Sequence, residues 1–199
     1  MTNKEIVPEA FFDSLSIAHK LDNVLDGFTF EEIHLFAYFA SIIFFNLGNN
    51  INEWGYRFIL NRESCYPFSE ELSFVLARHE SNGFLEKKNN YYSITARGVD
   101  EFNIFRKQKY FELREPLISG ACTVNILMPF SANREALLND SEIKKAKTLN
   151  DKRTLEPPYK ELKEVLEALN ISTDDPILHG VTWITYITEL NNVGIVDDA

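Results

Sequence analysis

The stretch that decides the fold runs from Tyr66 to Phe105 and reads YPFSEELSFVLARHESNGFLEKKNNYYSITARGVDEFNIF. Its residues predict a helix, a two-stranded hairpin and a second helix, because a start or stop signal stands at nearly every joint. Ser69 precedes the first helix as an N-cap, and Gly83 ends it. The hairpin turn falls at residues 87–90, where asparagine tolerates a positive φ. Thr95 then caps the next helix.

Two helices are predicted upstream of this stretch. Apolar residues at helical spacing place the first over Pro8–Leu25, whose proline suits a first turn. The second spans Phe30–Leu47 and is apolar on most sides, so we expect it at the centre of the core. Thr29 and Glu32 are spaced as a capping box at its start. Between the second helix and the deciding stretch, Ile51–Leu60 predicts a short helix or an irregular segment.

The signals weaken downstream of the deciding stretch. We predict one long helix from Thr95 to about residue 118, then a strand or a buried loop at Cys122–Phe130, and a helix at Ser131–Asn139. The polar segment Asn139–Pro158 is interpreted as a linker or a loosely held excursion. Two more helices are predicted, at Tyr159–Leu169 and Ile177–Leu190. The expected fold class is therefore α+β and mainly α.

Several residues of the deciding stretch match a known signature. They follow the pattern L…L…GFL…YxIT…G…F and are Leu72, Leu76, Gly83-Phe84-Leu85, Tyr92-Ser93-Ile94-Thr95, Gly98 and Phe102. In these residues the chain resembles winged-helix proteins. The resemblance implies an N-terminal helix (1–28), a winged-helix domain with a two-stranded wing (29–118) and a helical C-terminal region (119–199). It is nearly silent on activity, because winged helices serve repressors, antitoxins and complex subunits alike.

A closer likeness concerns residues 55–72. The strings GYRF and YPFSEEL look like the GYxF…YGP[FY]SxEL stretch of a group of small prokaryotic winged-helix proteins, often encoded beside toxins or defence systems. The chain lacks the glycine before Pro67, and nothing after Ile118 aligns. The resemblance implies a larger protein partner, such as an ATPase or nuclease of an antiviral defence or chromosome-associated complex.

The charge of the chain disfavours free nucleic acid as its partner. The net charge is −10, whereas phosphate binding normally leaves a basic footprint. The acidity is unevenly spread, since residues 26–110 hold 9 Lys and Arg against 11 Asp and Glu, and residues 111–199 hold 9 against 15. The stretch that resembles a winged helix is thus near neutral, and DNA binding by it is disfavoured but not excluded.

Composition also bears on the cellular compartment. The chain is 45% hydrophobic, which is ample for a core, and its longest apolar stretch is shorter than the ~20 residues that a membrane span needs. Cys65 and Cys122 are too few for a disulfide framework and are interpreted as free thiols in a reducing compartment. We therefore predict a cytoplasmic protein with no membrane partner.

The predicted helix at Glu70–Asn82 occupies the position of a DNA-reading helix. Its outward face repels phosphate, because three carboxylates oppose one guanidinium there. The acidic residues near its start also suit the helix dipole, which gives them a structural use. The residues expected to face the core are Leu72, Val75, Leu76 and His79, and the charged residues expected to face outward are Glu70, Glu71, Arg78 and Glu80.

An apolar residue interrupts this acidic face. Phe74 is placed outward with Ala77 beside it at helical spacing, and an exposed apolar spot is typical of protein contacts. The alternative is that the helical phase is shifted by one residue and Phe74 belongs to the core. The candidate partner-binding residues are Phe74, Ala77 and Arg78. They support an interaction subunit of a larger complex, and a homodimer is compatible with the sequence.

The alternative function is a DNA-binding regulator or antitoxin that contacts DNA through its wing. Lys87 and Lys88 are expected at the wing tip, and Arg97 follows the second strand. A wing can follow a phosphate backbone without reading its bases. These three residues are the candidate nucleic-acid contacts.

No catalytic or cofactor motif is visible in the sequence. None of the histidines, at positions 19, 34, 79 and 179, has a partner at the spacing of a recognisable metal site. A glycine-rich phosphate loop, a nucleophile elbow and an HExxH helix are all missing. We therefore expect a non-enzymatic protein without a metal or cofactor.

Overall fold

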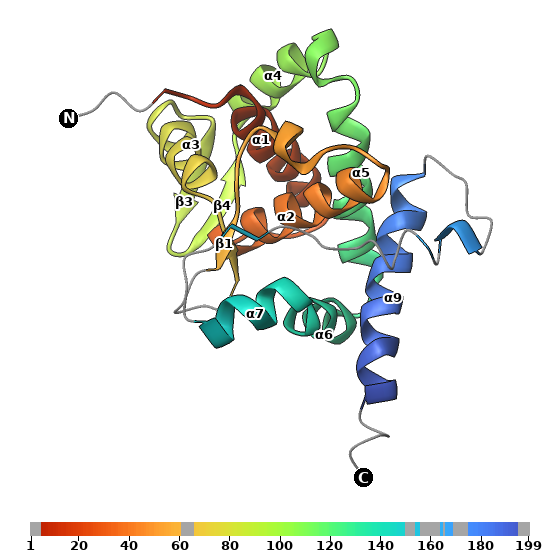
Figure 1. Ribbon diagram of the computed structural model, residues 1–199. Coiled ribbons are helices and arrows are strands. Elements are labelled where there is room, and N and C mark those ends of the chain that lie inside the picture. The colour runs from red at the N-terminus through yellow and green to blue at the C-terminus, as the bar shows by residue number, and fades with distance from the viewer. Residues whose placement is uncertain are drawn as a thin grey trace.

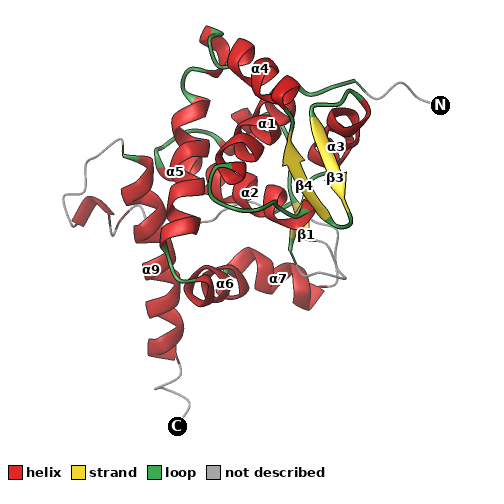
Figure 2. Ribbon diagram, turned by 180° about the vertical axis from the view of Figure 1, so that it is seen from behind, coloured by secondary structure: helices red, strands yellow, loops and turns green. Residues whose placement is uncertain are grey.

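The computed structural model describes residues 5–60, 66–149, 154–155, 164, 166–168 and 175–194. The fold is mainly helical with two small two-stranded antiparallel sheets, as expected for an α+β chain that is mainly α (Figure 1). Figure 2, from behind, shows that the strands gather at one end of the molecule, beside α3, while helices form the rest.

The two upstream helices are confirmed. Helix α1 spans Pro8–Asp22 with its proline in the first turn, and α2 spans Phe30–Asn46. The predicted capping box is present at the start of α2. The Glu32 backbone N–H donates to the Thr29 hydroxyl at 3.2 Å, and the Glu32 carboxylate accepts from the Thr29 backbone N–H at 2.6 Å. Helix α2 is buried along most of its length, which places it in the centre of the core.

The segment after α2 forms a short helix and then a sheet. The 3₁₀ helix η1 spans Ile51–Trp54, and β1 (Ile59–Leu60) pairs antiparallel with β2 (Pro67–Phe68). Thr154 bridges the first residue of β1, and the Leu155 N–H donates to the carbonyl just before that strand at 2.7 Å. This sheet was not predicted, because strands of two residues carry no measurable periodicity.

The deciding stretch, Tyr66–Phe105, forms the predicted order of helix, hairpin and helix. Helix α3 (Glu70–Ser81) leads to strands β3 (Leu85–Lys88) and β4 (Tyr91–Ile94) and then to α4 (Ala96–Phe105). The hairpin turn is tighter than expected, since only two residues lie between the strands. The first of them, Asn89, has a φ of 58°, which asparagine tolerates. The two lysines expected in the turn therefore belong to the end of β3.

Two close backbone contacts hold this unit together. Phe28, between α1 and α2, exchanges hydrogen bonds with Tyr92 of β4 at 3.0 and 2.7 Å, so a third chain segment flanks the hairpin. Gly98 of α4 lies against the start of the hairpin, where an added Cβ would be 2.2 Å from the carbonyl oxygen of Phe84. A side chain at this position would force α4 away from the strands.

The prediction of one long helix from Thr95 to about residue 118 is wrong. Helix α4 ends at Phe105, the 3₁₀ turn η2 occupies Lys109–Phe111, and α5 begins anew and spans Arg114–Leu127. Pro116 marks the new start, because a proline in the first turn of a helix costs no backbone hydrogen bond. The break turns the chain so that α5 packs beside α1 and α2.

Two further predictions downstream are also wrong. The expected strand or loop at Cys122–Phe130 is mostly the second half of α5, in which Cys122 and Val124 are buried while Ile126 and Leu127 are exposed. The expected linker contains α7 (Ser141–Leu149), which Asp140 caps by accepting from two backbone N–H groups at 2.8 and 3.0 Å. Helix α6 (Phe130–Asn139) is as predicted.

The C-terminal helix α9 (Pro176–Gly194) confirms the last predicted element. It packs closely on α5, since an added Cβ at Gly120 would lie 2.5 Å from Pro176 and one at Gly180 would lie 2.9 Å from Val124. A single cluster of buried apolar side chains extends from α1 to α9. Of the helix predicted at Tyr159–Leu169, most residues lie outside the described part of the chain. No helix in the described part is both long and apolar enough to cross a membrane.

Candidate interaction surfaces

The inward face of α3 is the one predicted. Leu72, Val75, Leu76 and His79 are all buried. The His79 Nε2 atom lies 2.8 Å from the Ser14 hydroxyl of α1, and the His79 ring packs against the Phe11 ring at 4.5 Å between centroids. Burial lowers the pKa of His79 to about 4. The histidine is therefore neutral at pH 7, and it fixes the orientation of α3 against α1.

Phe74 lies at the margin between the core and the outward face. Its ring is half-buried and packs against the core cluster. This position is intermediate between the two alternatives left open by the sequence, an outward-facing ring and a ring in the core. Ala77 and Arg78 are exposed beside it. The Arg78 guanidinium lies 5.3 Å from the centre of the Phe74 ring, within the range of a cation–π contact. The three predicted partner-binding residues thus form one small surface.

Carboxylates surround this small surface. Glu70 and Glu80 are exposed on α3, and Glu71 is half-buried, with its carboxylate accepting from the Ser69 hydroxyl at 2.9 Å. The carboxylates of the first turn interact favourably with the helix dipole. For a phosphate approaching α3, however, they raise the electrostatic energy. The face is therefore acidic with an apolar centre.

The three predicted phosphate-binding residues each have a neighbour within the chain. The Lys88 ammonium lies 3.4 Å from the Glu86 carboxylate, and the Lys87 ammonium lies 5.0 Å from the centre of the Tyr92 ring. Hydrogen bonding to Tyr92 also raises the pKa of Lys87. The Arg97 guanidinium lies 5.2 Å from the Phe84 ring. Because contacts between exposed groups are weak, these basic side chains can leave their neighbours and bind phosphate instead.

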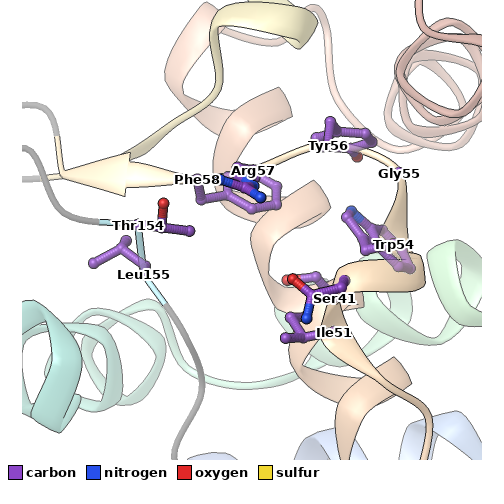
Figure 3. Close-up of a pocket in the computed structure, with 10 residues that line it drawn as sticks. Ser41, Ile51, Trp54, Gly55, Tyr56, Arg57, Phe58, Thr154 and Leu155 are labelled. Atoms are coloured by element: carbon purple, nitrogen blue, oxygen red, sulfur yellow. The ribbon is translucent and has the colours of Figure 1, made fainter.

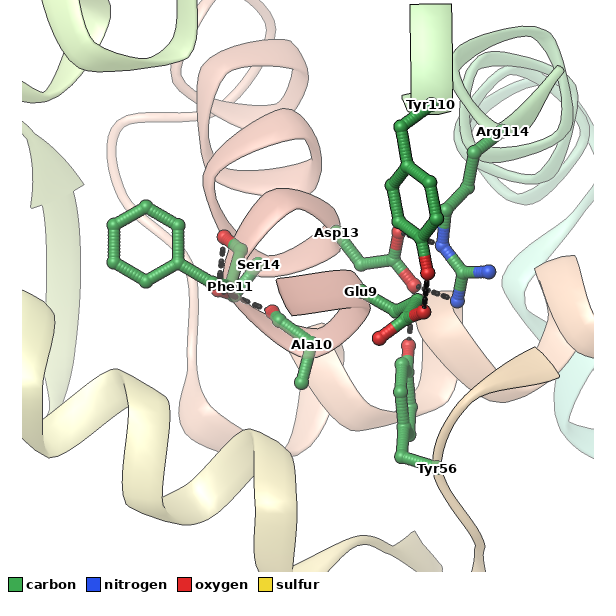
Figure 4. Close-up of polar contacts among 8 residues, drawn as sticks. All are labelled: Glu9, Ala10, Phe11, Asp13, Ser14, Tyr56, Tyr110 and Arg114. Carbon is green, nitrogen blue, oxygen red and sulfur yellow. Dashed lines mark hydrogen bonds and ion pairs between the residues drawn. The ribbon is translucent and has the colours of Figure 1, made fainter. Parts of the chain in front are cut away.

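A buried polar cluster joins α1 to α5 and was not predicted. The Asp13 carboxylate accepts from Nε and Nη2 of Arg114 at 2.6 and 2.7 Å, and from the Tyr56 hydroxyl at 2.6 Å (Figure 4). The Arg114 guanidinium lies 3.7 Å from the centre of the Trp54 ring. The residues come from three separate segments, so only the fold brings them together.

The electrostatics of this cluster explain its geometry. Burial raises the pKa of Asp13, and the bidentate contact with Arg114 opposes that rise. Arginine keeps its proton in proteins, and two short hydrogen bonds from its guanidinium favour the ionised form of the carboxyl, so the pair is interpreted as ionic. Asp13, Tyr56 and Arg114 are buried and hydrogen-bond to one another, and the cluster is therefore interpreted as a structural joint. The sequence carried no local signal of the cluster, because its residues lie far apart along the chain.

A cavity of about 250 Å³ lies between α2, η1 and the segment that leads into β1 (Figure 3). Trp54 and Ser41 line one side of it, and Arg57, Thr154 and Leu155 line the other. The lining offers one cation, hydroxyl groups and aromatic rings. The described residues of this lining include no carboxylate, histidine or cysteine.

The described residues hold neither a metal-ion cluster nor a reactive thiol. No group of three or more His, Cys, Asp or Glu side chains within them is placed to hold a metal ion. Cys122 is buried, and burial raises the pKa of its thiol to about 12, which leaves it unreactive at neutral pH. Cys65, the other predicted free thiol, lies outside the described residues.

Comparison with known proteins adds no relative. No family model matches this chain, and neither a curated protein nor a solved structure is detectably similar to it.

Proposed function

We propose that this chain is a non-catalytic winged-helix subunit that docks on a larger protein through the outward face of α3. The order of its elements supports the fold part of this proposal. Helices α1 and α2 precede α3, the hairpin follows it, and Phe28 lies as a third strand residue along β4, so the proposed domain begins with α1 and not at residue 29. A winged helix has this order, with a strand between its first two helices paired to the wing.

The composition of the α3 face carries the functional part. Phe74 gives the face a half-buried apolar centre, while Ala77 leaves space beside it for an incoming side chain. Three carboxylates, of Glu70, Glu71 and Glu80, make the same face unfavourable for phosphate. Apolar centres with a polar rim are typical of protein–protein contacts. The partner class that the sequence resemblance suggests is an ATPase or nuclease of a prokaryotic defence or chromosome-associated complex.

The test compares two surface variants in the native cell. Ala77→Arg adds a bulky cation at the centre of the face, and Lys88→Glu is the control on the wing. The tagged chain is purified from its host, and co-purifying proteins are quantified by mass spectrometry. We expect one larger protein in stoichiometric amount, reduced at least about tenfold by Ala77→Arg and unchanged by Lys88→Glu. A monodisperse wild-type chain without such a protein contradicts the proposal.

One observation favours the alternative function, in which the wing contacts DNA. The Lys88 side chain is 76% exposed at the end of β3, beside the tight turn. A gel shift at about 50 mM salt tests this function, because electrostatic affinity is strongest at low salt. If the wing binds DNA, Lys88→Glu weakens binding to all duplexes alike. Failure to bind any duplex under these conditions eliminates the alternative.

A further inference from the structure

A second concave surface is built by elements other than α3 and the hairpin. It is an open cleft of about 250 Å³ between the start of α1, the end of α2, η1 and the start of α5. Glu9 and Glu53 supply carboxylates to it, and Tyr110 and Leu113 form part of its rim. Arg114 of the buried joint also lines the cleft.

The position of Glu9 in this cleft depends on two neighbours. Gly55 follows η1 with a φ of 97°, and an added Cβ there would lie 2.7 Å from Cγ and Cδ of Glu9. The absence of a side chain at Gly55 therefore leaves room for the Glu9 stem. The Tyr110 hydroxyl donates a hydrogen bond to the Glu9 carboxylate (Figure 4). The carboxylate is thus held at the cleft by the local fold.

The charge of the cleft favours a cation. Arg114 is bound to Asp13 through two hydrogen bonds, so this pair is neutral as a unit. Glu9 and Glu53 remain, and they give the lining a charge of about −2. Glu53 is exposed and makes no ion pair with any residue in the described parts of the chain.

The rim favours an occupant with an apolar part. The Leu113 side chain is 84% exposed and the Tyr110 side chain is 65% exposed, although both border the charged lining. Arginine and lysine combine a hydrocarbon stem with a cationic head, which matches an apolar rim around carboxylates. Arginine fits better, because its planar guanidinium stacks on aromatic rings and pairs with carboxylates in a fork.

We propose that the Glu9–Glu53 cleft binds an arginine side chain of the partner protein. This inference rests on the proposed function, because it assumes that a protein partner exists. It places a second contact on the joint between α1 and α5, and it assigns a basic surface to the partner. The acidic charge of the whole chain steers such a partner toward it.

An NMR titration of the full chain tests the chemistry of the cleft. The probe is N-acetyl-arginine amide, and its neutral isostere N-acetyl-citrulline amide is the control. We expect the arginine probe to shift the amide signals of Glu53 and Leu113, and the citrulline probe to shift them much less. Glu53→Gln should weaken the arginine probe about threefold. Equal effects of both probes would assign the cleft to a neutral occupant and overturn the proposal, as would an unchanged affinity in Glu53→Gln.

The co-purification experiment separates this inference from the proposed function. Glu53→Lys should reduce the stoichiometric partner at least about fivefold, whereas Glu31→Lys, an exposed glutamate outside the cleft, should not. If Ala77→Arg removes the partner and Glu53→Lys does not, the cleft proposal is overturned and the proposed function stands. If the arginine probe binds selectively but no partner is found, the chemistry of the cleft is supported and the proposed function is overturned.

Discussion

The α3–β3–β4–α4 unit and the joint between α1 and α5 are held together in different ways. In the first, each element is fixed by residues close to it in the sequence: Ser69 caps α3, Asn89 makes the turn, and Thr95 caps α4. In the second, the ion pair between Asp13 and Arg114 connects residues that are 101 positions apart. The first unit is stabilised by many small local contacts, and the second is centred on a buried ion pair between distant residues.

This difference determines how each region responds to a substitution. A local cap is worth about 1 kcal/mol, and water replaces much of it when it is removed. A buried charge that loses its partner finds no replacement, so the cost is several times larger. The comparison predicts a steep order of effects on the free energy of unfolding, which the following three predictions test from the largest to the smallest.

The largest loss is expected at the buried joint. Arg114→Met leaves the Asp13 carboxylate buried, and among the described residues the Tyr56 hydroxyl is then its remaining hydrogen-bond partner from another segment. We expect the free energy of unfolding to fall by about 4 kcal/mol, as for other broken buried pairs. Urea denaturation followed by circular dichroism measures this change.

A double-mutant cycle controls this prediction. Asp13→Asn alone leaves the guanidinium without its charge partner, and the double variant with Arg114→Met removes both charges. We expect the double variant to lose clearly less stability than the sum of the single variants. Additive losses would show that the two residues contribute separately, and the joint would then be a packing feature and not an ion pair.

The second effect concerns the contact between the two regions, where His79 of α3 meets Ser14 of α1. The pKa of His79 is about 4 in the folded chain and 6.5 as the ordinary value, so only the unfolded chain takes up this proton between these pH values. The contribution of His79 to the free energy of unfolding is therefore fully present above pH 6.5, and it is lost as the pH falls toward 4. The loss from His79 should total about 3 kcal/mol.

Comparison with His79→Gln isolates this loss. Glutamine keeps a polar group near the Ser14 hydroxyl but does not titrate, so its stability curve should lack the His79 contribution. His19 and His34 also have lowered pKa values, chiefly because of burial, and they contribute with the same sign in both proteins. Parallel curves for wild type and variant between pH 6.5 and pH 4 would contradict the prediction.

The sequence predicted the local unit well, because its signals act over a few residues. The spacing of apolar residues in α3 identified all four buried positions, and the capping residues located the helix starts. Phe74 was left open for a physical reason: its ring lies at the boundary of the core, where a helical phase does not decide between inside and outside. The candidate interaction surface was therefore predicted in its residues, but the degree of exposure of Phe74 was not.

The sequence failed where tertiary contacts decide the structure. The second half of α5 contains β-branched residues that favour strands, and the burial of one of them, Val124, in the packing of α5 on neighbouring helices favours the helix. Pro116 was a local signal that a new helix begins near it. The prediction of one long helix did not use this signal. The Glu9–Glu53 cleft and the Asp13–Arg114 pair had no local signal, because they form only when distant segments meet.

The smallest expected loss of stability concerns the α3–β3–β4–α4 unit, at the Thr95 cap of α4. The Thr95 hydroxyl accepts from the Gly98 backbone N–H at 3.1 Å and donates to the Gly83 carbonyl at 2.7 Å. Thr95→Ala removes both bonds, and we expect a loss of about 1 kcal/mol in the urea-derived free energy of unfolding, with an unchanged slope. Thr185→Ala is the matched control. Its hydroxyl is exposed in mid-helix and bonds to the Val181 carbonyl, so alanine should be neutral or stabilise by up to about 0.5 kcal/mol. A loss at Thr95 as large as that in Arg114→Met would mean that the cap is needed for the whole fold, and the contrast between the two regions would not hold.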